Sequence, residues 1–184
     1  CNQNNYYICN YETILNENGV CGAIYSIEGT SIVVKIEHSG DSATVIKGIK
    51  EDTIMICDSD FLINEKRLIK FCELLEKQKI KKTYICYGSV NSILEKEYLF
   101  ERLSKNGVKA VIVGLESFSD VFLKKYNKSA TIDENYKAVQ ILKRNGIATW
   151  GTFILHPDFS KEDFKNFRKY LRFLKPEMIS FTPL

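Results

Sequence analysis

The sequence predicts an α/β fold built on a sheet of parallel strands. From residue 52 onward, five short apolar runs alternate with four segments that have the apolar spacing of amphipathic helices. The connections between them are short, and repeated strand–helix–strand units favour right-handed crossovers between parallel strands. Two architectures satisfy this pattern, an open doubly wound sheet and a barrel. A complete eightfold barrel needs about 250 residues, so a barrel built from this chain would be partial.

The five apolar runs predict strands near residues 53–57, 83–87, 109–113, 148–155 and 178–182. Between the first two, residues 64–80 carry Leu68, Phe71 and Leu75 at helical spacing, and Asn64 stands where an N-cap is expected. Residues 93–107 predict a second helix, which Gly107 ends.

The remaining two helices are predicted over residues 133–146 and 161–174. Gly146 closes the first, and Ser160 caps the second. Residues 1–50 have no clear period, although 22–27 and 30–38 resemble short strands and a helix could begin at Ser39. We therefore interpret the chain as a single domain, with an irregular N-terminal segment over 1–50 and βα repeats over 51–184.

The composition excludes several classes of protein. The formal net charge of +3 is too balanced to indicate nucleic acid as a partner. The apolar runs are too short to span a membrane, and no signal peptide is visible. The six cysteines lack a regular disulfide spacing, which favours a reducing compartment and a cytoplasmic location. Because the chain begins with Cys1 and ends in a strand-like "ISFTPL", we interpret it as a fragment or an excised domain.

Polar side chains follow the predicted strands, where parallel α/β sheets bind their ligands. The first strand is followed by Asp58 and Asp60, the second by Ser89 and Asn91, the third by Gly114, Glu116 and Ser117, and the fourth by His156. Gly114 would let a ligand approach the backbone, and Glu116 could accept hydrogen bonds from hydroxyl or ammonium groups. The alternative for Glu116 is that it caps the turn after its strand. His156 could act as an acid or base, or simply stabilise a turn.

Several motifs in this order resemble the radical S-adenosylmethionine superfamily. They are "CDSDFLINEKRL", "YICYGSVNSI", "VIVGLESFSD", "YNKSATIDENYKAVQILKRNGI", "GTFILHPDFSKEDF" and "ISFTPL", and they cover roughly residues 40–184. The resemblance is closest to the branch that is often fused to cobalamin-binding domains. It implies a partial (βα)6 TIM-like barrel, truncated or irregular at its N-terminus, in which the five predicted strands are the second to the sixth.

The same resemblance implies two cofactors, a 4Fe-4S cluster held by three cysteine thiolates and S-adenosylmethionine bound to the open iron. It assigns Gly114 and Glu116 to the strand end that contacts the ribose or amino group of S-adenosylmethionine, with Ser117 beside them, and Asp58 and Asp60 to its methionine end. Ser89 and Asn91 stand where the family often has Arg and Asp. Cobalamin could join through a domain outside this chain, and a flavodoxin or ferredoxin would supply electrons.

The cysteine pattern departs from that family. Its three ligands are separated by three and then two residues, and if Cys21 is the third ligand, the others would fall at Ile14 and Asn18. A cluster on Cys1, Cys9 and Cys21 would need a different loop, whose closure costs modest entropy. The alternative is three unrelated free cysteines.

Three functional hypotheses follow. The first is a radical S-adenosylmethionine enzyme, or the core fragment of one, that abstracts hydrogen from a small-molecule or peptide substrate. The second is a non-catalytic relic or binding module that keeps the barrel without a cluster. The third is a hydrolytic or isomerising barrel that uses Asp58, Asp60, Glu116 and His156.

Overall fold

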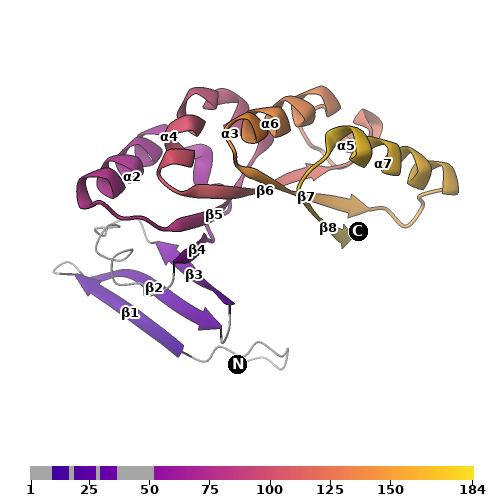
Figure 1. Ribbon diagram of the computed structural model, residues 1–184. Coiled ribbons are helices and arrows are strands. Elements are labelled where there is room, and N and C mark those ends of the chain that lie inside the picture. The colour runs from indigo at the N-terminus through magenta and orange to yellow at the C-terminus, as the bar shows by residue number, and fades with distance from the viewer. Residues whose placement is uncertain (1–9, 17–18, 28–29, 37–51) are drawn as a thin grey trace.

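The computed structural model describes residues 10–16, 19–27, 30–36 and 52–184 of the chain (Figure 1). Within this part, one sheet contains eight strands in the order of the sequence. The strands are β1 (Asn10–Asn16), β2 (Gly19–Ile27), β3 (Thr30–Ile36), β4 (Thr53–Ile56), β5 (Thr83–Gly88), β6 (Val108–Glu116), β7 (Ala148–Leu155) and β8 (Met178–Pro183).

The strands from β3 to β8 pair in parallel, which confirms the five strands predicted from residue 52 onward. Each new strand is added on the same side of the previous one. A doubly wound sheet reverses its strand order at a switch point. The absence of such a reversal between β3 and β8 leaves the second architecture, a sheet that curls into a partial barrel.

The helices lie on one face of this sheet, as Figure 1 shows. They are α2 (Glu65–Gln78), α3 (Val90–Glu95), α4 (Phe100–Lys105), α5 (Asp120–Lys125), α6 (Ile132–Arg144) and α7 (Lys161–Leu174), with short 3₁₀ turns η1 (Phe61–Ile63) and η2 (Glu97–Leu99). No helix in the described part of the chain combines the length and the apolarity needed to cross a bilayer.

Two predicted N-caps are confirmed. The Asn64 side chain accepts a hydrogen bond from the Arg67 amide, and Ser160 forms a reciprocal capping box with Asp163. A third cap was not predicted: α6 begins at Ile132, because Thr131 forms a capping box with Glu134.

The segment predicted as one helix over 93–107 is divided into α3, η2 and α4. The apolar repeat is interrupted at Lys96 and Glu97 and starts again at Leu99, so a single straight helix could not bury both halves. The short helix α5, which follows the end of β6, was not predicted either.

The N-terminal segment adds three strands. The two predicted runs form β2 and β3, and β1 pairs antiparallel with β2 although its sequence gave no strand signal. β3 then joins β4 in parallel. The helix predicted from Ser39 falls outside the described residues.

The main core lies between the sheet and its helices. Alternate strand residues such as Ile54, Tyr84 and Val111 face this layer and are almost fully buried. Phe71 of α2 packs edge-on against Phe61 and Tyr84, with ring centroids 5.2 Å apart in both pairs. Such aromatic contacts add to the free energy gained by burying apolar area.

The sheet ends in β8, whose outer edge faces no other described strand. This edge strand carries large apolar side chains that remain 40–68% exposed, namely Met178, Ile179, Phe181 and the following Leu184. Phe181 reaches the helix side, where its ring lies 5.8 Å from that of Phe167.

Two helix-ending glycines allow a matched test of the fold. Gly107 has a φ of +98°, and a β-carbon there would lie 2.0 Å from the Lys82 carbonyl oxygen; Gly146 has a φ of +66° with nothing within 4 Å. We expect Gly146→Ala to cost about 1–2 kcal/mol of unfolding free energy through the left-handed backbone alone. Gly107→Ala should cost at least about 2 kcal/mol more, because the backbone must also move. Urea denaturation of both variants measures this difference, and equal losses would contradict it.

Candidate functional site

A cavity of about 250 Å³ lies at the carboxyl ends of β5 and β6. It is bounded by the two strand ends, by the start of α3, and by the segment that joins α5 to α6. Its walls are Ser59, Gly88, Ser89, Val90, Asn91, Gly114, Leu115, Glu116, Leu123, Lys128, Ser129, Ala130 and Asn135. Four of the residues predicted to bind a cofactor are therefore brought together here: Ser89, Asn91, Gly114 and Glu116.

The end of β6 has an unusual backbone. Glu116 has a φ of +62°, and the Ser117 amide donates a 2.7 Å hydrogen bond to the Leu115 carbonyl across it. A turn of this kind around a residue with positive φ is rare and strained. The pairing of β6 with β7 also shifts its register between Gly114 and Glu116. The result is that β6 stops abruptly and its carboxylate is turned back over the strand end.

The space beside Gly114 is filled by this carboxylate. A β-carbon at position 114 would lie 2.7 Å from Oε1 of Glu116. The glycine was predicted to let a ligand approach the backbone. In the structure its missing side chain makes room for Glu116, so Gly114 allows that carboxylate to take its position.

Lys128 forms an ion pair with the same carboxylate oxygen of Glu116. Its ammonium lies 2.8 Å from Oε1, and the Glu116 side chain is only 18% exposed. The hydroxyl of the neighbouring Ser129 accepts a 3.1 Å hydrogen bond from the side-chain Nδ2 of Asn91. This bond connects the α5–α6 segment to the start of α3. The cavity thus contains one carboxylate and one ammonium group within a rim of hydroxyl and amide groups.

Asn135 supports the strand end from behind. It is fully buried, and its Nδ2 donates a 2.8 Å hydrogen bond to the Leu115 carbonyl. Its side chain also lies near the buried hydroxyl of Tyr170: burial raises the pKa of that phenol to about 12, and a hydrogen bond with Asn135 opposes the rise.

The sequence analysis missed three of these residues, Lys128, Ser129 and Asn135. The signal was present, since "NKS" begins eleven residues after Glu116 and is part of the family resemblance. It had not been assigned to the site because no residue pattern showed that the chain folds back over the end of β6.

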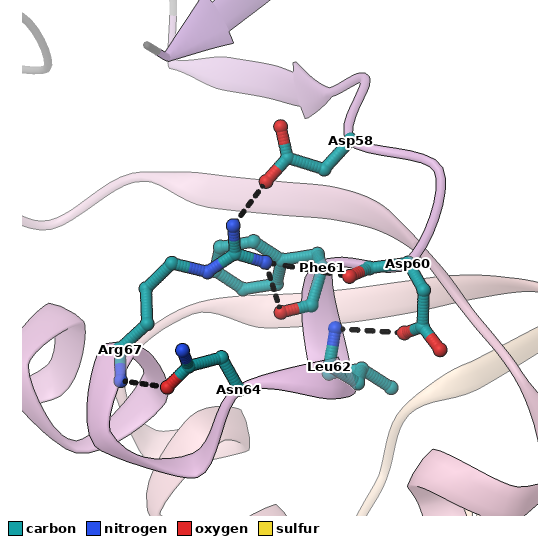
Figure 2. A network of polar contacts seen from close by, with 6 residues as sticks. All are labelled: Asp58, Asp60, Phe61, Leu62, Asn64 and Arg67. Carbon is teal, nitrogen blue, oxygen red and sulfur yellow. Dashed lines mark hydrogen bonds and ion pairs between the residues drawn. The ribbon is translucent and has the colours of Figure 1, made fainter. Parts of the chain in front are cut away.

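Asp58 and Asp60 have structural partners, which Figure 2 shows. The Arg67 guanidinium lies 2.7 Å from Oδ2 of Asp58 and donates a 2.7 Å hydrogen bond to the Phe61 carbonyl and a longer one, 3.3 Å, to the Asp60 carbonyl. It also stacks over the Phe61 ring, 5.1 Å from the centroid. One cation therefore fixes the turn after β4.

Both oxygens of Asp60 accept hydrogen bonds inside the protein. Oδ1 accepts from the Leu62 amide at 3.0 Å, and Oδ2 accepts from the Ser92 hydroxyl at 2.7 Å. Ser89 in turn caps α3 by accepting from the Ser92 amide. Asp58 and Asp60 do not line the cavity, but Asp60 joins the turn after β4 to the helix that forms the cavity wall.

The other predicted site residues lie elsewhere. Ser117 is fully buried, and its hydroxyl has no partner among the described residues. His156 lies among aromatic rings, and its Nδ1 accepts a 3.2 Å hydrogen bond from the Asp158 amide. The described part of the chain contains no group of three His, Cys, Asp or Glu side chains that could hold a metal ion.

The cysteines predicted to hold a cluster are only partly within the described residues. Cys1 and Cys9 lie outside them, whereas Cys21 lies in β2. Ile14, which stands at the position of the first family ligand, lies in β1 and pairs with Gly22. Ile14 and Cys21 therefore lie on two antiparallel strands, and Asn18 lies outside the described residues.

The concave side of the strand ends also carries neutral titratable groups. Burial raises the pKa of the Cys57 thiol, and the nearby Asp58 carboxylate adds to the effect. Burial likewise raises the pKa of Tyr87, with a smaller contribution from Cys57. Both side chains are consequently protonated and uncharged at neutral pH.

Comparisons with known proteins agree with this geometry. A family model described as "Radical SAM superfamily" matches residues 26–171. The anaerobic magnesium-protoporphyrin IX monomethyl ester cyclase of Rubrivivax gelatinosus is 31% identical over 129 residues, which are 70% of this chain and 23% of that protein. The hopanoid C-3 methylase of Methylococcus capsulatus is 23% identical over 74% of this chain and 26% of its own length. The chain spans about a quarter of the length of these relatives.

Solved structures share the fold. The radical S-adenosylmethionine methyltransferase TsrM from Kitasatospora setae, with cobalamin and a 4Fe-4S cluster bound, gives a TM-score of 0.62 at 14% identity over 77% of this chain and 29% of its own. Coproporphyrinogen III oxidase (HemN) from Escherichia coli gives 0.60 at 14% identity, over 72% and 31%. At these identities the likeness shows the fold alone, and it confirms the predicted partial barrel.

The Arg67 network makes a prediction about stability. Arg67→Lys keeps the charge but removes the planar fork that contacts Asp58 and two carbonyls together, so at least one charge-assisted bond is lost. We expect a loss of about 1.5–3 kcal/mol in the free energy of unfolding. The exposed Arg168 of α7 provides the control, because Arg168→Lys breaks no comparable network. Guanidinium denaturation compares the two variants, and a loss of the same size in both would refute the role given to Arg67.

Proposed function

Because the chain belongs to the Radical SAM superfamily, we propose that it is the S-adenosylmethionine-binding core of a radical enzyme. The observation that carries the proposal is the cavity at the ends of β5 and β6, in which Glu116 and Lys128 place a negative and a positive group side by side. Its position at the carboxyl ends of parallel strands is the usual place for a ligand in such a sheet.

The charges of the cavity fit the cofactor that the family implies. The methionine end of S-adenosylmethionine carries an ammonium and a carboxylate, and its ribose carries two hydroxyl groups. Glu116 can accept hydrogen bonds from the ammonium or from the hydroxyls, and Lys128 can pair with the carboxylate. Asn91 and Ser89 offer further polar contacts on the opposite wall.

The internal ion pair has a consequence for binding. Glu116 and Lys128 form an ion pair with each other, which keeps a largely buried carboxylate paired. A zwitterionic ligand offers a cation to Glu116 and an anion to Lys128. Each residue can therefore exchange its present partner for the ligand without becoming unpaired. When bound together, the cluster and S-adenosylmethionine supply the electron transfer and the radical that abstracts hydrogen; the chain supplies placement and exclusion of water.

For the cluster we propose Cys1, Cys9 and Cys21 as the thiolate ligands. The support is that the family requires three thiolates and that two of the three cysteines of the βα repeats, Cys72 and Cys86, are buried in the helix-side core. Burial raises the pKa of Cys72 to about 11 and that of Cys86 to about 12, which disfavours the thiolate form that binds iron.

The whole enzyme, of which this chain would be a part, is proposed to act on a small-molecule or peptide substrate and to take electrons from a flavodoxin or ferredoxin. Cobalamin enters the proposal because TsrM is a structural neighbour with cobalamin bound. The two relatives named above are a cyclase of a magnesium-protoporphyrin ester and a methylase of a hopanoid, so the relatives include more than one type of reaction.

Binding of S-adenosylmethionine tests the cavity. We expect Glu116→Gln to weaken binding about tenfold to a hundredfold, because it removes charge-assisted bonds worth about 1.5–3 kcal/mol. Gly114→Ala should weaken it as well, since the new methyl group would displace the carboxylate. Glu162→Gln is the control, because Glu162 forms an exposed Glu–Lys pair with Lys165 on α7, outside the cavity wall. Calorimetric titration measures the affinity of the wild type and the three variants for S-adenosylmethionine. Unchanged affinity in the Glu116 variant would mean that this carboxylate only stabilises the turn after β6.

Anaerobic reconstitution with iron and sulfide tests the cluster. The wild-type chain should take up about four irons and show a broad absorption band at about 400 nm. Cys21→Ser should abolish both signals, whereas Cys57→Ser, which alters a half-buried thiol at the end of β4, should leave them unchanged. Iron content of the purified proteins gives the answer. If the Cys21 variant takes up as much iron as the wild type, Cys21 is not a ligand. If the wild type takes up no iron, the result favours a scaffold without a cluster.

A further inference from the structure

The outer side of α7 carries a stripe of basic residues. The helix and its C-cap, residues 161–175, contain six basic and two acidic side chains, whereas the rest of the chain contains 20 and 21. The excess positive charge of the chain is therefore concentrated on this one helix. Four of the basic residues recur at intervals of four, three and four positions, and all four are exposed. They are Lys161, Lys165, Arg168 and Arg172.

This spacing aligns the four residues along one side of an α-helix, over a length of about 16 Å. The buried residues of α7, Phe167, Tyr170 and Leu174, lie on the opposite side. Figure 1 shows α7 at one end of the helix layer. The stripe therefore points away from the core, at a place that a large partner can approach.

The stripe is unfavourable for the helix itself. Like charges that are three or four residues apart repel each other along a helix. Lys165 has this spacing from Lys161, Arg168 and Lys169. Arg172 has it from Arg168 and Lys169. A partner that carries negative charge would remove this repulsion, and so would bind with a gain that an evenly charged helix does not offer.

Other helices in the described part of the chain balance their charges. In α6, Lys137 pairs with Asp133 at 2.6 Å, and in α4 Lys105 pairs with Glu101 at the same distance. In the stripe of α7, Lys165 has a carboxylate partner, Glu162, at 3.2 Å. The other three residues of the stripe form no ion pair with another described residue. Their charges are available to a partner.

Two exposed aromatic rings flank the stripe. Phe164 and Phe173 of α7 are 51% and 59% exposed. Each is held in place by one neighbouring ring: Phe164 packs edge-on against Phe159 at 5.7 Å, and Phe173 stacks on Tyr136 at 4.7 Å. A purely hydrophilic partner would gain nothing from these rings. The interfacial layer of a bilayer favours aromatic side chains next to basic ones.

We propose that the outer face of α7 binds the surface of a membrane that contains anionic phospholipids. The basic stripe attracts the phosphate groups, and the two flanking rings enter the interfacial layer. The helix lies on the surface and does not insert, because its apolar side is occupied by the protein core. The inference requires neither the cluster nor S-adenosylmethionine, so it goes beyond the proposed function and stands or falls separately from it.

Vesicle flotation with the cofactor-free chain tests the proposal. The vesicles are phosphatidylcholine alone, or an equimolar mixture of phosphatidylcholine and phosphatidylglycerol. Flotation counts only protein that rises with lipid, so self-associated chain is not mistaken for bound chain. We expect binding to the anionic vesicles to be at least about tenfold tighter than to the neutral ones, and to weaken as salt screens the charges.

A matched pair of double variants locates the binding. Arg168→Gln with Arg172→Gln removes two charges from the stripe and should weaken binding to the anionic vesicles about thirtyfold. Lys66→Gln with Lys70→Gln removes two charges from exposed positions of α2, four residues apart, and should leave binding within about twofold. Circular dichroism checks that both proteins are folded.

The aromatic rings have their own test. Phe164→Ser should weaken vesicle binding at least about threefold, because the ring no longer enters the interface. Ile63→Ser is the control, since Ile63 is 66% exposed and lies outside α7. Phe173→Ser provides the same test if Phe164→Ser does not fold.

Two water-soluble polyanions, a uridine oligonucleotide and poly-L-glutamate, carry negative charge without an apolar interior. We expect both to bind at least about tenfold more weakly than the anionic vesicles. Tighter binding of either one would overturn the proposal and assign the stripe to nucleic acid or to an acidic protein. Equal binding to neutral and anionic vesicles, or equal effects of the two double variants, would also overturn it. A separate titration of S-adenosylmethionine decides the proposed function.

Discussion

The parallel pairing of β3 to β8 is the constraint on which the rest of this structure depends. Parallel strands must be joined by crossovers, and here the described crossovers all run over the same face of the sheet. One face therefore becomes a helix-covered core, and the carboxyl ends of the strands are brought to a common edge. Three features meet at this edge as a result of the topology: the strained end of β6, the capped start of α3 and the turn after β4.

The sequence predicted much of this architecture because the signals are local. Buried runs of Val and Ile, and caps such as Asn64 and Ser160, act within a few residues and identify strands and helix starts. The break at Lys96, the helix α5 and the strand β1 could not be found in the same way, because each is determined by packing against distant parts of the chain. In the candidate site, Glu116 and Gly114 could be identified from their place after a strand. Lys128 and Asn135 could not, since their contact with the end of β6 depends on how α5 and α6 fold back.

The structure also separates two kinds of polar residue that the sequence could not distinguish. Asp58 and Asp60 were grouped with Glu116 because all three follow a strand. Asp60 uses both carboxylate oxygens to hold the backbone and Ser92, and Asp58 is engaged by Arg67, so these two acids build the frame around the cavity. Glu116 is different because its partner, Lys128, also faces the cavity. Partners that face a cavity can be exchanged for a ligand, whereas partners within the fold cannot be exchanged without loosening it.

The free edge of β8 has a consequence for the behaviour of the chain in solution. An unpaired strand presents a row of amide and carbonyl groups, and here the row is flanked by Met178, Ile179, Phe181 and Leu184, all substantially exposed. Natural proteins usually guard such edges with lysine, proline or a covering element, because two uncovered edges readily pair between molecules. β8 has a proline only at its last position, Pro183, and no lysine. Within β8 itself no charge interrupts the apolar side chains, and the net charge of +3 provides little long-range repulsion. We therefore expect the isolated chain to self-associate through this edge. A segment that covers β8, or a detergent, would favour the monodisperse form.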